Sequence, residues 1–201
     1  VILANPPFGG KEKANIQENF PIKTGETAYL FLQHFIKKLK IGGRCGVVIK
    51  NTFLSNTDNA SIAVRKQLLE ECNLFSVLDL PGGVFTGAGV KTVVLFFEKG
   101  KETKNIWFYS LKLERNLGKT NPLSEKDLEQ FTSSQPEFLE TKYSWNINIK
   151  DIDKSSYDLS IKNPNIIETP NTLKPEQILN TIEQLNLEEN KIIKEIKEIL
   201  K

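Results

Sequence analysis

The turn Asn5-Pro6-Pro7-Phe8 carries residue types suited to chemistry; it follows the apolar run 1–3 and precedes two glycines. The Asn5 side-chain oxygen accepts hydrogen bonds, and the prolines stiffen the backbone while their carbonyls remain acceptors. A planar amino group could give one hydrogen to Asn5 and one to the Pro6 carbonyl, which would make its nitrogen more nucleophilic. Phe8 could stack on the attached ring, as a base-modifying enzyme requires once its target base leaves the DNA stack. We therefore predict that Asn5, Pro6, Pro7 and Phe8 are catalytic.

An ordinary structural turn is the competing interpretation of these four residues, because Asn and Pro are frequent where strands end. The preceding apolar run is typical of a buried strand in a parallel sheet. In open α/β sheets, ligands bind beyond the carboxyl ends of the strands. Residues 5–8 would lie at that edge, which favours the chemical interpretation.

A glycine-rich loop at residues 81–90 carries a second candidate, Phe85. This ring could pack against the sheet edge, or it could face Phe8 and enclose a base between two aromatic rings. A phosphate-binding loop is excluded because a strand follows, whereas a phosphate cradle leads into a helix N-terminus. Phe8 and Phe85 are the predicted base-binding pair.

The elements that position these residues alternate along the chain. The hydrophobic pattern predicts helices that begin at Thr24 and after Asp58, and strands at 1–3, 45–49, 74–80 and 92–97. Strands that alternate with helices indicate a parallel α/β sheet, whereas the last strand lacks a preceding helix and should pair antiparallel. Further segments are predicted as strands at 106–111, 145–149 and 157–161, and as a short helix after Ser124.

Composition limits the possible functions. The chain has 201 residues, 39% of them hydrophobic, which suffices for one core and a small appendage. It contains no methionine and opens inside an apolar run, so we expect a piece of a longer protein. The net charge of +2 does not itself indicate nucleic acid, and DNA contacts would come from local patches. The polar loop 11–23 could be one of these, or a solvated surface loop.

Cysteine and histidine usage argues against a metal site. Cys45, Cys72 and the single His34 lack the spacing of a zinc site. Two reduced thiols fit a cytoplasmic protein. No apolar run reaches the roughly 18 residues of a membrane span, so no membrane partner is expected.

The C-terminal region is predicted to be a separate helix behind a linker. Residues 1–163 form the expected catalytic domain, 164–174 the linker and 175–201 the helix. Isoleucine and leucine recur along this helix at heptad spacing, and Glu189 interrupts them. The helix could lie on its own domain, or it could pair with a helix of another chain or of a second copy.

The turn at residues 5–8 resembles the catalytic motif of the amino-group DNA methyltransferases. Further stretches are similar to the modification (M) subunit of type I restriction–modification systems, and together they extend the match to about residue 165: 25–34, 43–49, 81–85, 91–97 and 157–164. The resemblance implies the C-terminal half of a Rossmann-like methyltransferase fold. That fold has a mixed, mainly parallel sheet with one antiparallel strand, here followed by a helical tail.

The resemblance also implies a function. The family transfers a methyl group from S-adenosyl-L-methionine to adenine N6 in DNA, in a complex with a specificity subunit and a restriction subunit. Asn5 and the Pro6 carbonyl would hold the amino group, Phe8 would stack on the base, and Phe85 would be a second aromatic contact. The tail helix would pack against the specificity subunit.

Two departures from the family pattern matter. Lys50 stands where the family usually has proline. The family's glycine-rich cofactor loop and acidic ribose ligand precede the turn at 5–8, so no cofactor-binding residue is expected within these 201 residues. The fragment alone should therefore be inactive, and it should self-associate through the edge strand 1–4 or the helix 175–201. Methylation of a protein glutamine, which uses a similar pocket, and a non-catalytic assembly module are the alternatives.

Overall fold

A computed structural model describes residues 1–85, 89–165 and 175–199 of the chain. These residues belong to two compact units, Val1–Asn165 and Ile166–Lys201. The first unit contains the predicted α/β sheet and the candidate site, and the second contains a long helix. Within the described residues, every helix is too short or too polar to cross a membrane.

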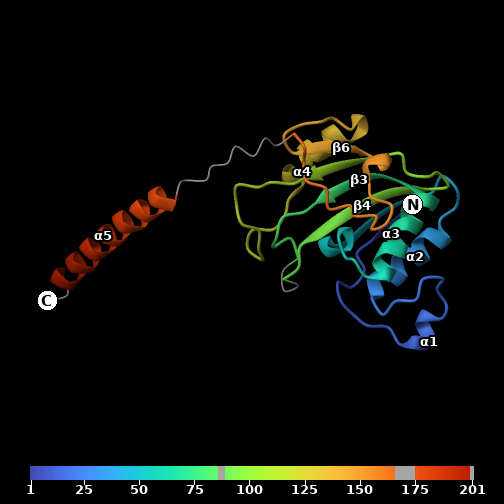
Figure 1. The fold of residues 1–201 in the computed structure, drawn as a ribbon, viewed down its shortest axis with the longest axis horizontal. Helices are drawn as coiled ribbons and strands as arrows, with labels where there is room; N and C mark the ends of the chain where they lie inside the picture. The colour runs from blue at the N-terminus through green and yellow to red at the C-terminus, as the bar shows by residue number, and fades with distance from the viewer. Residues whose placement is uncertain (86–88, 166–174, 200–201) are drawn as a thin grey trace. The chain divides into compact units, whose positions relative to one another are not determined.

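The sheet of the first unit has six strands in the order β1-β2-β4-β3-β5-β6 (Figure 1). β1 pairs parallel with β2, and β3 pairs parallel with β5. β4 lies between β2 and β3 and is antiparallel to both, as predicted for the strand without a preceding helix. The strands are β1 (Ile2–Ala4), β2 (Arg44–Lys50), β3 (Cys72–Asp79), β4 (Thr92–Lys99), β5 (Asn105–Ser110) and β6 (Ser144–Asn148).

The predicted fold class is confirmed, with one difference in strand direction. Two strands run antiparallel to their neighbours, because β6 joins the sheet beside β5 in the antiparallel sense. The sequence predicts this segment as a short strand but does not fix its direction. The ring of Trp145 on β6 stacks on that of Phe108 at 5.4 Å, which secures the pairing.

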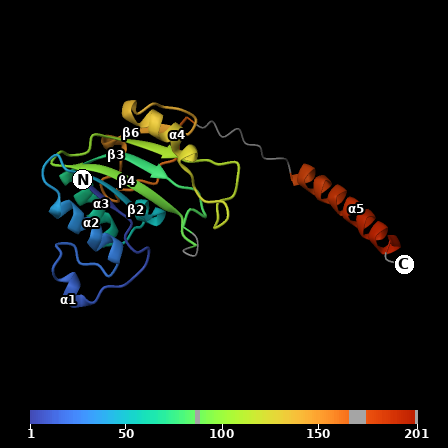
Figure 2. The same cartoon turned by 180° about the vertical axis from the view of Figure 1, so that it is seen from behind.

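Helices cover both faces of the sheet, as Figures 1 and 2 show. Strand side chains alternate between the faces, so Phe108 joins the larger core and Trp107 the smaller one. The helices α2 (Thr27–Lys38) and α3 (Asn59–Glu71) pack into the larger core. On the other face, α4 (Glu125–Ser134) contributes Phe131 to the smaller core. The remaining short helices are α1 (Ala14–Gln17), η1 (Asn51–Leu54), η2 (Gln135–Glu137) and η3 (Ile149–Asp151).

One predicted boundary and one predicted strand are wrong. α2 begins at Thr27, because the Thr24 hydroxyl accepts the Glu26 N–H in a turn before the helix. Residues 157–161 are not a strand, although their apolar residues alternate. Tyr157 has a φ of 47°, and Leu159 alone is fully buried, with its N–H donated to the Leu54 carbonyl at 2.9 Å. Tyr157 and Ile161 pack partly against the same core, so the alternating apolar residues are buried without a sheet ladder.

Arg65 on α3 is a buried cation that links two distant segments. Its side chain is 0% exposed, and its guanidinium donates only to backbone carbonyls at 2.7–2.8 Å: those of Phe53, Asn56, Ser156 and Tyr157. Desolvation lowers its pKa from the ordinary value. The turn after β2 and the last part of this unit are thus held by one side chain.

The second unit contains α5 (Pro175–Ile199), which begins at the predicted proline. Its described side chains are exposed, including large apolar ones such as Ile182, Leu185 and Ile192. The predicted linker 164–174 lies mostly outside the described residues.

Candidate functional site

The turn 5–8 lies at the carboxyl end of β1, as predicted. Asn5 and Pro7 are exposed, Pro6 is buried and Phe8 is half-buried. Among the residues that the structure describes, no hydrogen bond engages the Asn5 side chain or the Pro6 carbonyl. Neither acceptor is therefore engaged by another described group of the protein.

The structure brings Phe8 and Phe85 together from different loops. Their ring centroids are 4.9 Å apart and the ring planes meet at 65°, an edge-to-face contact. This differs from the predicted arrangement, in which a base lies between two facing rings. A base that stacks flat on Phe8 would require the Phe85 ring to turn or shift.

Phe85 also packs partly against the smaller core. It contacts this cluster together with Val84, Leu113 and Leu123, and it remains half-buried. The ring therefore packs against the smaller core and contacts Phe8 at the same time, so core packing does not exclude a contact with a base.

Lys50, the last residue of β2, places a positive charge beside the turn. Its Nζ lies 3.5 Å from Glu26 Oε1, and both side chains are about one-third exposed. A Cβ built on Gly9 would lie 3.9 Å from the same Nζ. A partly exposed ion pair of this length is weak, so the ammonium group could exchange Glu26 for another anion such as a phosphate.

Asp79, the last residue of β3, closes the base of the loop that carries Phe85. Its Oδ2 lies 2.8 Å from Lys91 Nζ, and its Oδ1 accepts the Asn51 side-chain amide at 3.3 Å. The Asn51 N–H also donates to the Lys91 carbonyl at 2.9 Å. Sequence reasoning missed this clamp, although Asp79 gave a signal by interrupting an apolar run.

Metal-ligating and thiol side chains are the other candidates for chemistry within the described ranges of this unit. No group of three metal-ligating side chains occurs there. Cys45 and Cys72 are buried, and burial raises the pKa of each thiol to about 12, so neither is a ready thiolate. A groove of about 860 Å³ is lined by Asn73, Asn105 and Trp107 at the amino ends of β3 and β5, the sheet edge opposite the turn.

Across residues 1–85 and 89–165, no glycine-rich turn leads from a strand directly into a helix of several turns. The residues at the carboxyl edge offer two unengaged acceptors beside an aromatic contact.

Comparison with known proteins gives a consistent result. The family model for N-6 DNA methylases matches residues 1–172. The methylase subunit of the type I restriction enzyme EcoEI from Escherichia coli is 35% identical, over 100% of this chain and 43% of the relative. The EcoKI methylase subunit from E. coli K12 is 34% identical, over 65% of this chain and 26% of the relative.

Solved structures show similarity to the same kind of protein as the sequence comparison. A chain from a study of assembly and conformational transition of the type I R-M system matches with a TM-score of 0.75 and 34% identity, over 99% of this chain and 45% of that one. The EcoKI M protein matches with a TM-score of 0.69 and 26% identity, over 81% of this chain and 44% of that protein. The chain thus spans less than half the length of these relatives.

Proposed function

This chain belongs to the N-6 DNA methylase family, and on that premise we propose that it forms the adenine-binding part of a DNA methyltransferase. The enzyme would be the modification subunit of a type I restriction–modification complex. It would transfer a methyl group from S-adenosyl-L-methionine to the N6 amino group of adenine.

The observation that carries this proposal is the pair of unengaged acceptors beside an aromatic contact. Asn5 Oδ1 and the Pro6 carbonyl would each accept one N6 hydrogen, which draws the amino group out of conjugation with the ring. The N6 lone pair then becomes a better nucleophile. Phe8 would hold the base flat, and Phe85 would bound the pocket on its other side. The stiff prolines keep the Pro6 carbonyl in place, and the exposed Asn5 side chain would be ordered when the amino group binds.

Adenine must leave the duplex to reach this turn, at a cost of a few kcal/mol in lost stacking and pairing. Stacking on an aromatic ring offsets part of this cost, at about 1–3 kcal/mol per base. The charge of Lys50 beside the turn would bind a flanking phosphate in exchange for its loose contact with Glu26.

Family membership supports S-adenosyl-L-methionine as the methyl donor, and the cofactor supplies an electrophilic methyl group when bound. The described residues fit the acceptor base, and they lack the strand-to-helix glycine turn that suits this cofactor. We therefore assign residues 5–8 and Phe85 to the base. A protein made of these 201 residues alone would neither bind the cofactor tightly nor methylate DNA.

The domain boundaries and partners are part of the same proposal. Residues 1–163 would belong to the catalytic domain, 164–174 would be a linker, and 175–201 would bind the specificity subunit of a complex that also holds a restriction subunit. The apolar side chains exposed along α5 suit such a helix partner.

The chain alone would self-associate through β1, where Val1 and Leu3 are 88% and 81% exposed, or through α5. An enzyme that methylates the DNA of its own cell would be located in the cytoplasm.

Protein-glutamine methylation is the alternative activity, because an amide nitrogen fits the same two acceptors. The DNA methylase relatives favour adenine. Incubation of the assembled complex with isotopically labelled S-adenosyl-L-methionine, together with either DNA or a protein extract, separates the two. We expect label in N6-methyladenine by mass spectrometry of the digested DNA. Label confined to methylated glutamine would overturn the proposal, and label in neither would favour an assembly module.

A further inference from the structure

The loop between β5 and α4, residues 111–124, lies directly against the loop that carries Phe85. Gly83 has a φ of +84°, and a Cβ built on it would lie 2.5 Å from the Leu117 carbonyl oxygen. Leu113 and Leu123 pack against the same apolar cluster as Phe85. The Phe85 loop is thus backed by a second loop, through one backbone contact and one shared apolar cluster.

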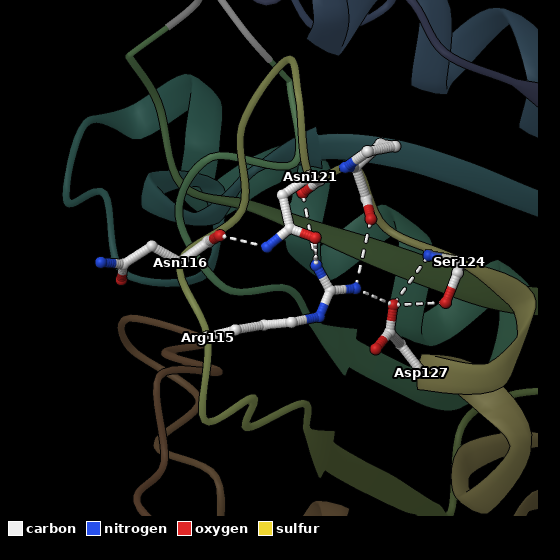
Figure 3. Close-up of polar contacts among 6 residues, drawn as sticks. Arg115, Asn116, Asn121, Ser124 and Asp127 are labelled. Carbon is white, nitrogen blue, oxygen red and sulfur yellow. Dashed lines mark hydrogen bonds and ion pairs between the residues drawn. The ribbon is translucent and has the colours of Figure 1, made fainter.

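Arg115 fixes the shape of this second loop (Figure 3). Its Nη1 donates to Asn121 Oδ1 at 2.5 Å, and its Nη2 donates to the Pro122 carbonyl at 3.2 Å. Nη2 also donates to Asp127 Oδ2 at 2.6 Å. One planar guanidinium therefore joins the far end of the loop to the first turn of α4.

Asp127 is itself held at the start of α4. Its Oδ2 accepts the Ser124 N–H at 2.8 Å and the Ser124 hydroxyl at 2.7 Å, as Figure 3 shows. These bonds, together with the charge of Arg115, lower the pKa of Asp127 from its ordinary value. The carboxylate stays ionised near neutral pH, so the ion pair with Arg115 persists there.

The segment between the two ends of this network contains Leu117. Asn121 Nδ2 donates to the Asn116 carbonyl at 3.0 Å, and Gly118 and Asn121 exchange backbone hydrogen bonds at 3.1 and 3.2 Å. The Leu117 carbonyl, which meets Gly83, is thus bracketed by residues that Arg115 and Asn121 hold. Loops with few core contacts are usually mobile. Most of the hydrogen bonds of this network are solvent-exposed, but several act on one short segment and together restrict its motion.

We propose that residues 111–124 brace the Phe85 loop, and that Arg115 is a positioning residue for binding of the target base. This inference rests on the base-binding role proposed for Phe85. A base that stacks on Phe8 replaces the edge contact between Phe8 and Phe85, and the brace limits how far Phe85 then withdraws. Arg115 acts without touching the base, because it sets the position of Leu117 against Gly83.

A double-mutant cycle in the assembled modification enzyme tests this role. Arg115→Met removes the four hydrogen bonds that the guanidinium donates, at similar volume. Arg44→Met, an exposed arginine at the start of β2, is the control. We expect Arg115→Met to lower kcat/KM for DNA about tenfold when Phe85 is present, and less than about twofold in a Phe85→Ala background. An equal loss in both backgrounds, or no loss with Phe85 present, would overturn the proposal.

The contact can be tested from the other loop as well. Gly83→Ala places a methyl group against the Leu117 carbonyl, whereas a Cβ on the neighbouring Gly82 meets nothing within 4 Å. Fluorescence of 2-aminopurine at the target position should change for Gly83→Ala and match wild type for Gly82→Ala. Identical signals for the two variants would contradict the brace.

If Asn5→Ala abolishes methylation while the Arg115 and Gly83 variants behave as wild type, the brace fails and the proposed function stands. If Asn5→Ala methylates normally, the proposed function fails.

Discussion

The rings of Phe8 and Phe85 meet edge to face with their centroids 4.9 Å apart, although they follow different strands of the sheet. Edge-to-face pairs are favourable because the positive edge of one ring meets the negative face of the other. The contact therefore holds two loops together at the carboxyl edge, beside the unengaged acceptors of Asn5 and Pro6. A nucleobase would exchange this ring contact for stacking.

Loss of the Phe85 ring should weaken binding of the target base. Phe85→Ala is expected to cost about 1–3 kcal/mol in DNA binding, the usual value of one base–aromatic stack. Phe85→Tyr should retain most of this binding free energy, because the aromatic ring is kept. Titration of DNA that contains the recognition site measures the change, with Phe31→Ala, an exposed ring on α2, as control. Equal affinity of Phe85→Ala and wild type would contradict the base-binding role.

Asp79 should matter more for activity than for stability. Asp79→Asn removes the ion pair with Lys91, which is partly exposed and therefore worth about 0–1 kcal/mol of folding free energy. The looser base of the Phe85 loop should still raise KM for DNA several-fold. Glu70→Gln breaks the exposed pair with Lys66 and serves as the matched control. If both variants have wild-type KM values, the clamp does not position the loop.

Arg65→Met should destabilise the first unit strongly. The substitution removes the donor from the buried Phe53 carbonyl and from three part-buried carbonyls, those of Asn56, Ser156 and Tyr157. An unsatisfied buried acceptor costs about 1–3 kcal/mol, so we expect a total loss of about 3 kcal/mol. Urea unfolding followed by circular dichroism measures the free energy of unfolding, and Arg44→Met is the exposed control. A change below about 1 kcal/mol would show that the carbonyls find other partners.

The two buried thiols predict a specific pH dependence. Burial raises the pKa of Cys45 and of Cys72 to about 12 from the ordinary value of 9.0. The folded state favours the neutral thiols. Their contribution to the free energy of unfolding is therefore fully present below pH 9.0 and is lost as the pH rises toward about 12. Labelling with a maleimide at pH 7.5 should modify neither residue until the protein is unfolded. Rapid labelling of the folded protein would show that the thiols are accessible.

The sequence predicts those features that local patterns encode. Apolar runs located the strands, Asp58 and Ser124 marked helix starts, and the turn at residues 5–8 stood out by residue type. The direction of β6 and the irregular path through Leu159 depend on tertiary packing, which a periodic pattern does not specify. Contacts between side chains far apart in sequence, such as Lys50 with Glu26, have no local signal at all.

The proposed brace formed by residues 111–124 also depends on tertiary contacts that have no local signal in the sequence. Arg115 is one charged residue in a polar loop, and its role depends on where Asn121 and Asp127 lie in space. The glycines near Phe85 could be read as loop residues, whereas only the structure shows that Gly83, and not Gly82, meets a neighbouring carbonyl.

Asn5→Ala tests the central claim most directly. The assembled enzyme is incubated with DNA and S-adenosyl-L-methionine, N6-methyladenine is quantified by mass spectrometry, and subunit assembly is measured on the same preparation. Removal of one positioned hydrogen-bonding group at a reacting atom typically costs about 100- to 1,000-fold, so we expect a loss of at least about 100-fold with assembly intact. Methylation within about twofold of wild type by a fully assembled Asn5→Ala enzyme would contradict the account.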